Sequence, residues 1–119
     1  MVGYTMVSLW ILSQPITGSP SLNLLHAPKG SVSLAPFEFR ERCFELAKND
    51  IIQYDFQSGR PVEFDIHFHD GFTIRYAVKQ TVSVVGATQF AAKTDQSYCL
   101  MWFNRSLKKT SLKYRAVGP

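Results

Sequence analysis

The stretch VEFDIHFHDGFTIRYAVK, residues 62–79, decides the fold prediction. In its first half, four apolar residues alternate with polar ones, which is the pattern of a half-buried β-strand. Asp70-Gly71 then marks a tight turn, and the alternation resumes after it. Residues 62–79 therefore predict one antiparallel hairpin. The residues expected to face the core from its second strand are Phe72, Ile74, Tyr76 and Val78.

Further short strands are expected on both sides of this hairpin. Residues 51–56 alternate between apolar and polar side chains, and residues 58–61 (SGRP) close that strand. Residues 80–93 add one or two short strands, with Gly86 marking a turn or a bulge. Residues 98–104 (YCLMWFN) are almost wholly apolar, as a central strand covered on both faces would be.

The last expected strand begins at Thr110, and Asn104 is expected to cap the turn before it through bonds to nearby backbone. About seven strands, short turns and no clear helix predict the all-β class. The expected architecture is an antiparallel β-sandwich of jelly-roll-like form, because two facing sheets bury the inward sides of alternating strands. Residues 37–119 are expected to form this single domain.

Residues 1–36 are expected to form an irregular N-terminal arm. Four prolines and two glycines interrupt residues 13–37, and proline cannot supply an N–H to a sheet. The first twelve residues (MVGYTMVSLWIL) are mostly apolar but too short to span a bilayer, and no basic residues precede them as in a secretory signal. They are either a truncated or degraded signal or an apolar arm, and a periplasmic or secreted location is favoured over a cytoplasmic one.

The two cysteines, Cys43 and Cys99, do not form a C-x-x-C motif, which excludes a zinc ribbon and a thioredoxin-like site. From the residues alone they form either one disulfide or two buried thiols, depending on the redox compartment. The chain also contains neither Gly-x-Ser-x-Gly nor a Gly-rich phosphate loop. The sequence therefore predicts no enzymatic activity, no catalytic residues and no cofactor.

Asp65, His67 and His69 form the most specific group of polar residues. On a strand, residues two apart project from the same face, so these three side chains are expected together. Two imidazoles and a carboxylate could hold zinc or copper. The alternative interpretation is a polar sheet face with a cross-strand pair to Arg75.

Positive charge is concentrated in the second half of the chain, where residues 71–119 carry eight basic side chains and one acid. Arg75, Lys113 and Arg115 are expected on an exposed sheet face and are a candidate interaction surface. Another protein is the preferred partner, and an anionic membrane surface is the second. Nucleic acid is disfavoured, because the basic residues are not interleaved with base-binding aromatics.

Three stretches together resemble a known family: residues 43–45 (CFE), residues 61–71 (PVEFDIHFHDG) and residues 98–104 (YCLMWFN). They are similar to the GOLD (Golgi-dynamics) domain, a β-sandwich of eukaryotic cargo-trafficking proteins and some lipid-transfer proteins. They are closer still to uncharacterised bacterial GOLD-like proteins. The resemblance covers about residues 41–117. It implies a non-catalytic module for protein–protein or membrane-proximal interaction, with a disulfide between Cys43 and Cys99.

The sequence thus favours a GOLD-like binding module. The alternative function is an extracytoplasmic zinc- or copper-binding protein that uses the His-x-His strand at His67 and His69.

Overall fold

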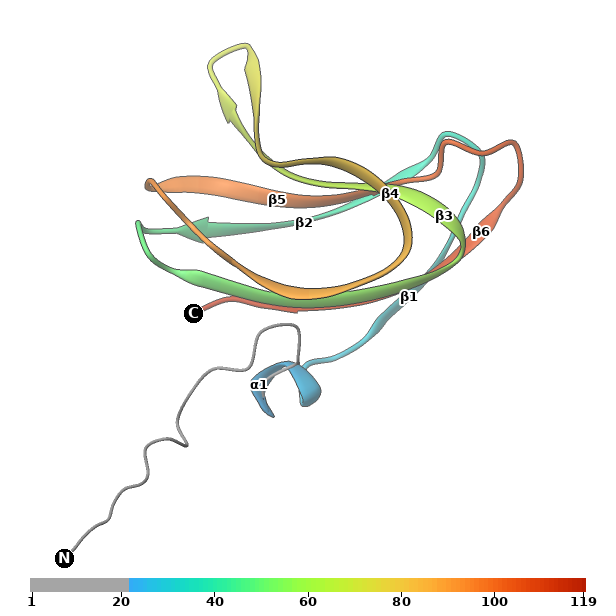
Figure 1. The fold of residues 1–119 in the computed structure, drawn as a ribbon, viewed down its shortest axis with the longest axis horizontal. Coiled ribbons are helices and arrows are strands. Elements are labelled where there is room, and N and C mark those ends of the chain that lie inside the picture. The colour runs from blue at the N-terminus through green and yellow to red at the C-terminus, as the bar shows by residue number, and fades with distance from the viewer. Residues whose placement is uncertain (1–21) are drawn as a thin grey trace, which may run out of the picture.

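The computed structural model describes residues 22–119, which form a short helix followed by six β-strands (Figure 1). The all-β, antiparallel class is therefore confirmed. No helix among the described residues is long and apolar enough to cross a membrane. The elements are α1 (Leu22–Leu25), β1 (Gly30–Leu34), β2 (Phe39–Leu46), β3 (Ile51–Asp70), β4 (Thr73–Ala91), β5 (Gln96–Phe103) and β6 (Thr110–Val117).

The strands form three nested antiparallel pairs. β3 pairs with β4, β2 with β5, and β1 with β6, so that partners lie progressively farther apart along the chain. β3 also pairs with β6 over its first part and with β5 over its second part. All six strands therefore belong to one sheet, in the order β1-β6-β3-β5-β2, with β4 on the other edge of β3.

β3 carries this sheet from one layer into the other. Residues 53–58 lie beside β6 and residues 63–67 beside β5. Between these segments the register with β4 shifts, and Arg60 N donates a 2.8 Å hydrogen bond to Thr110 Oγ1. Such an irregularity bends a strand without ending it, so residues 58–61 do not close the strand as expected. The two layers of the predicted sandwich are halves of one rolled sheet (Figure 1).

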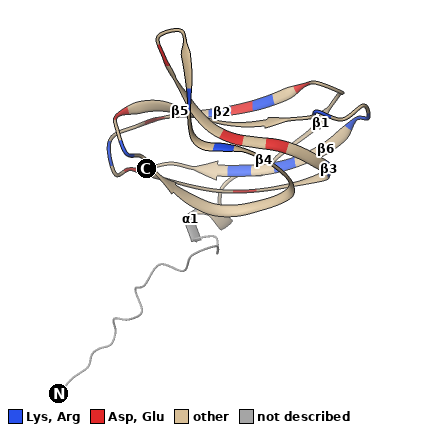
Figure 2. Cartoon of the chain, turned by 45° about the horizontal axis from the view of Figure 1, so that its top comes forward, with Lys and Arg blue, Asp and Glu red and all other residues tan. Residues whose placement is uncertain are grey.

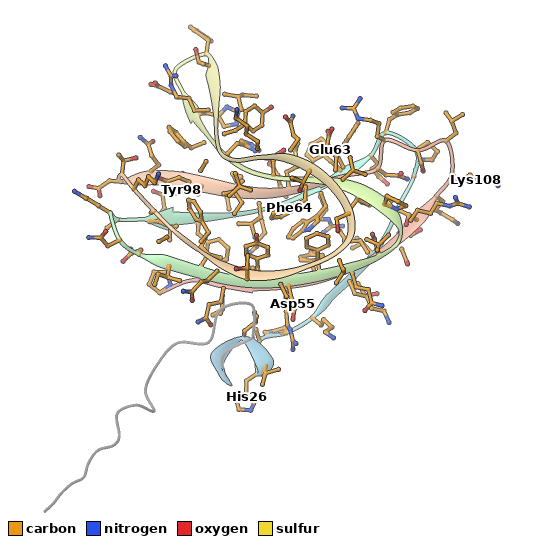
Figure 3. All side chains as sticks on the ribbon, in the orientation of Figure 1. His26, Asp55, Glu63, Phe64, Tyr98 and Lys108 are labelled. Carbon is orange, nitrogen blue, oxygen red and sulfur yellow. A yellow bond between two sulfur atoms is a disulfide. The ribbon has the colours of Figure 1, made fainter. Side chains whose placement is uncertain are left out.

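The core fills the space between the two layers, where Phe64 and Tyr98 lie (Figure 3). Trp102 is fully buried at its centre, and the rings of Phe56, Phe64 and Tyr114 surround it at centroid distances of 4.8 to 6.0 Å. The inward faces predicted for β3 are confirmed. The buried core consists of Leu34, Leu46, Ile52, Tyr54, Phe56, Val62, Phe64, Ile66, Ala92, Tyr98, Leu100, Trp102, Leu112 and Ala116.

β4 differs from the prediction in its length and its exposure. It is one continuous strand rather than the second arm of a short hairpin followed by one or two short strands. The turn itself is confirmed, with Gly71 at a φ of 64°. However, Phe72, Ile74 and Tyr76 were expected in the core and are 109%, 47% and 41% exposed. The tip of the β3–β4 hairpin extends beyond the two layers (Figure 1), so no facing layer covers these side chains.

Gly86 marks neither a turn nor a bulge. It lies within β4, in regular register with Phe56 on β3. A Cβ atom at this position would lie 2.4 Å from Cε1 of the Phe56 ring. Glycine is required here because the aromatic ring occupies the space that any side chain would need.

The folded domain begins before Phe37. β1 lies in the segment expected to be an irregular arm, and it pairs with β6 from Gly30 to Leu34. Leu34 is buried in the core. Pro28 and Pro36 lie on either side of β1 and do not interrupt it. The number of prolines and glycines in this segment therefore does not exclude a strand. The apolar first twelve residues lie outside the described part of the chain.

Asn104 connects two loops at one end of the rolled sheet. Its fully buried side chain accepts hydrogen bonds from Ser106 N and Oγ at 3.0 and 2.7 Å, which confirms the predicted turn cap. Its amide Nδ2 also donates to the carbonyl oxygens of Leu34, Ala35 and Lys108 at 2.8 to 3.1 Å. The side chain therefore ties the end of β1 to the β5–β6 loop.

Candidate functional site

A buried polar group lies on the face of β3 opposite the core. Alternation along the strand places Phe64 and Ile66 in the core and therefore directs Asp65 and His67 to the other face. Asp65 is 0% exposed and His67 is 3% exposed. Glu41 joins them from β2, where it contacts the His67 ring. We call these three residues the His67 group.

Both ring nitrogens of His67 contact carboxylates. Asp65 Oδ1 lies 2.6 Å from Nδ1, and Glu41 Oε2 lies 3.2 Å from Nε2. The second oxygen of Asp65, Oδ2, is buried without a hydrogen-bond partner among the described residues. The Asp65 contact fixes the ring orientation and directs Nε2 towards Glu41.

Burial raises the pKa of the Asp65 carboxyl above its ordinary value, because desolvation disfavours the charged form. The hydrogen bond and charge of His67 oppose this shift, whereas the charges of Glu63 and Glu41 add to it. The folded protein therefore holds a proton on this carboxyl more tightly than on an exposed aspartate.

The disulfide lies directly beside the His67 group. Cys43 on β2 and Cys99 on β5 are cross-strand partners and are bonded to each other. Cys99 is in turn the cross-strand partner of His67 on β3. The pairing implied by the family resemblance is thus confirmed. The two sulfur atoms and a carboxylate oxygen of Glu41 all lie within 4.8 Å of one another.

The predicted metal ligands are only partly brought together. Asp65 and His67 are in contact, but His69 is exposed and its ring centroid lies 5.4 Å from that of His67. Sequence reasoning missed Glu41, although it precedes Cys43 by two residues and so shares its face. The Cys43–Cys99 pairing links only β2 and β5, and the further pairing of β5 with β3 is what brings Glu41 to His67. Zinc or copper binding by the predicted ligands stays a prediction.

The three cations predicted to form one surface lie at two places. Arg75 is at the β3–β4 tip, where its Nε donates a 3.0 Å hydrogen bond to Asp70. Lys113 and Arg115 are on β6, and Arg115 forms an ion pair of 2.9 Å with Asp55. Figure 2 shows the basic residues of the tip apart from those of β6, with acidic residues also on the tip. The predicted common surface is therefore not formed, because the tip projects away and two of the cations are paired with acids.

An exposed apolar surface follows β4. Among the described residues β4 pairs only with β3, so its other edge has no strand partner. Residues 80–92 contain no charged residue, and Val82 and Val85 are 67% and 60% exposed. We call this edge, together with the apolar side chains of the tip, the β4 surface. It consists of Phe72, Ile74, Tyr76, Val82, Val84 and Val85.

The part of the β4 surface near the hairpin tip shares one face of the sheet with the His67 group. Tyr76 is the cross-strand partner of His67, and Ile74 is the partner of His69. The rings of Tyr76 and His67 approach edge-on at a centroid distance of 6.2 Å. A molecule bound on this side of the hairpin would therefore lie close to both features.

No protein-family model and no curated protein matches the chain. Among solved structures, a de novo designed double-stranded β-helix is similar at 18% identity and a TM-score of 0.43, over 76% of this chain and 99% of the designed one. PliG of Aeromonas hydrophila, a periplasmic inhibitor of g-type lysozyme, is similar at 14% identity and a TM-score of 0.48, over 77% of this chain and 87% of PliG.

Proposed function

We propose that this protein is a non-catalytic binding module that accepts another protein on the β4 surface. The observation that supports this proposal is the free edge of β4, which is uncharged over residues 80–92. Natural proteins usually protect an exposed sheet edge with charged residues, proline or a covering loop. An unprotected edge of this length is a place where a partner can add a strand.

Two kinds of contact are available to such a partner. The backbone of β4 offers the N–H and C=O groups of its free edge, which give affinity without requiring a particular sequence. The exposed side chains of Val82 and Val85 flank this edge and would be buried on binding. Phe72 at the hairpin tip, which is 109% exposed, provides a further apolar contact.

The proposed setting is extracytoplasmic. The Cys43–Cys99 disulfide supports it, because disulfides persist in oxidising compartments and are rare in the cytosol. A GOLD-like role in protein–protein contact near a membrane agrees with this setting and forms part of the proposal.

The test compares two variants that place lysine at exposed apolar positions. Val82→Lys/Val85→Lys adds charge to the β4 edge, whereas Leu107→Lys changes a residue that is 83% exposed in the β5–β6 loop. Proteins retained by the immobilised wild-type chain from its native source are identified and purified, and their affinity for all three proteins is measured by calorimetry. We expect the double variant to bind at least about tenfold more weakly, which corresponds to about 1.4 kcal/mol.

The control variant Leu107→Lys is expected to bind like the wild type. Equal affinity of all three proteins for every purified partner would show that the β4 surface is not the binding site. Circular dichroism of the double variant is measured first, because substitutions at exposed positions should leave the fold intact.

A further inference from the structure

We propose that reduction of the Cys43–Cys99 disulfide creates a zinc site formed by the two thiolates, His67 Nε2 and the Glu41 carboxylate. The site is independent of partner binding on the β4 surface. It also differs from the predicted set of Asp65, His67 and His69, because it takes its ligands from three strands.

Three of the four donors already form a close group, and His67 contacts that group through Glu41. The sulfurs of Cys43 and Cys99 and a carboxylate oxygen of Glu41 lie within 4.8 Å of one another, and Glu41 Oε2 lies 3.2 Å from His67 Nε2. Tetrahedral zinc holds sulfur at about 2.3 Å and nitrogen or oxygen at about 2.0–2.2 Å, so its ligand atoms are roughly 3–4 Å apart. Rotation of side chains after the S–S bond opens is the adjustment that the site requires.

The strand pairing holds these donors in place. Cys43 is opposite Cys99, and Cys99 is opposite His67, so three of the ligands occupy one row across β2, β5 and β3. Glu41 precedes Cys43 by two residues on β2 and projects from the same face. The ligands are therefore supplied by sheet positions rather than by loops, which keeps their spacing fixed.

His67 is oriented as zinc-binding histidines usually are. A histidine that binds zinc commonly uses its other ring nitrogen to contact a carboxylate, which fixes the ring and its tautomer. Here Asp65 Oδ1 lies 2.6 Å from Nδ1 of His67, and Asp65 is fully buried. Nε2 is thereby left to face the ligand side. His69, on the same strand, is exposed.

The oxidation state of the cysteines controls the site. A dithiol reductant gives two electrons and two protons to the S–S bond, which breaks to form two thiols, while the reductant becomes a disulfide. Zinc binding then releases the two thiol protons, because only the thiolate is an effective ligand. In the oxidised protein the sulfurs are bonded to each other and cannot supply that charge, so the oxidised protein is expected to bind no zinc at this site.

The experiment uses the full chain, oxidised and reduced, titrated anaerobically with Co²⁺ as a spectroscopic substitute for zinc. We expect the reduced protein to bind one equivalent with thiolate-to-cobalt charge-transfer absorption, and Zn²⁺ to displace it. The oxidised protein should show neither. A reduced, folded protein without stoichiometric uptake, or uptake that does not depend on reduction, would overturn the proposal.

Variants identify the ligands. Cys99→Ser should at least halve the charge-transfer absorption of the reduced protein, because one of the two thiolates is lost, and His67→Ala should lower its affinity at least tenfold. Asp65→Asn should weaken binding by about tenfold to a hundredfold through loss of ring orientation. His69→Ala is the matched control and should leave affinity unchanged. Binding that depends on His69 but not on Cys99 would replace this site with the set of Asp65, His67 and His69.

The double variant Cys43→Ser/Cys99→Ser is the control for loss of the disulfide, because it removes both the bond and the two thiolates. If the reduced wild-type chain unfolds, Zn²⁺ is added before the reductant and folding is followed by near-ultraviolet circular dichroism. Zinc should then preserve the fold of the wild type but not that of the double variant. Failure of zinc to preserve the reduced fold would also overturn the proposal.

Discussion

The substitution Asn104→Asp tests how the loops at one end of the rolled sheet are held. The new side chain has the same shape and keeps an acceptor for Ser106, but oxygen replaces the donating amide nitrogen. That nitrogen now donates to the carbonyl oxygens of Leu34, Ala35 and Lys108. The variant therefore removes hydrogen bonds without creating a cavity.

The magnitude follows from the number of donors. An amide nitrogen carries two hydrogens, so two donated bonds are lost although three carbonyls receive them. A buried polar group left without its partner costs about 1–3 kcal/mol. Allowing for repulsion between the carboxylate and the carbonyls, we expect the free energy of unfolding to fall by about 3–5 kcal/mol at pH 7. A domain of this kind is stabilised by about 5–15 kcal/mol in total, so the loss is easily measured.

Urea unfolding followed by tryptophan fluorescence measures this loss at pH 7 and pH 5. The carbonyls disfavour the charged form, so the pKa of the new carboxyl should be raised in the folded state. The loss in free energy of unfolding should then be smallest below pH 3.9, which is about the pKa of this carboxyl in the unfolded chain. The loss should grow as the pH rises through the pKa in the folded state. Asn104→Ala serves as the uncharged control. A loss below about 1 kcal/mol at pH 7 would refute the assignment of these hydrogen bonds.

Three further outcomes are expected. Gly86→Ala should lower the free energy of unfolding by about 1–3 kcal/mol in urea titrations, because its Cβ would meet the Phe56 ring; an unchanged midpoint would show that the ring moves freely. Reducing the disulfide, which closes a loop of 56 residues, should cost about 4 kcal/mol on the chain-entropy model, and unchanged thermal melting would contradict this. Burial raises the pKa of Tyr54. The stability contributed by its neutral form should therefore be full below about pH 10, and it should fall as the pH rises through the pKa of Tyr54 in the folded state. Tyr54→Phe should therefore flatten the alkaline loss of stability in urea titrations, and parallel pH curves would count against it.

Alternation predicted the inner face of β3 correctly and failed on β4. Phe64 and Ile66 are buried as expected, because the opposite layer covers that part of the sheet. Ile74 and Tyr76 follow the same pattern but are exposed. Periodicity shows which side chains share a face, but whether another layer covers that face depends on where the strands travel. The bend of β3 at residues 58–61 sets this path, although the sequence SGRP there predicts the end of a strand.

The candidate site could likewise be predicted only in part from the sequence. Spacing alone placed Asp65 and His67 on one face, since both lie on a single strand. Glu41 is 26 residues before His67 and reaches it only because β5 pairs with both β2 and β3. The predicted basic surface failed for a related reason, because Arg115 is neutralised by Asp55 on a neighbouring strand. Contacts between strands depend on register, which local sequence does not specify.

The nested pairing of the strands has a consequence for how the chain folds. The β3–β4 hairpin joins residues that are close in sequence, whereas β1 must find β6 across most of the chain, with Gly30 opposite Tyr114. The entropic cost of closing a loop grows with its length, so the innermost pair is expected to form first. The β2–β5 and β1–β6 pairs would then close in turn around it. A protein with so many distant contacts should fold slowly, and β1 and β6 should be the last strands to pair.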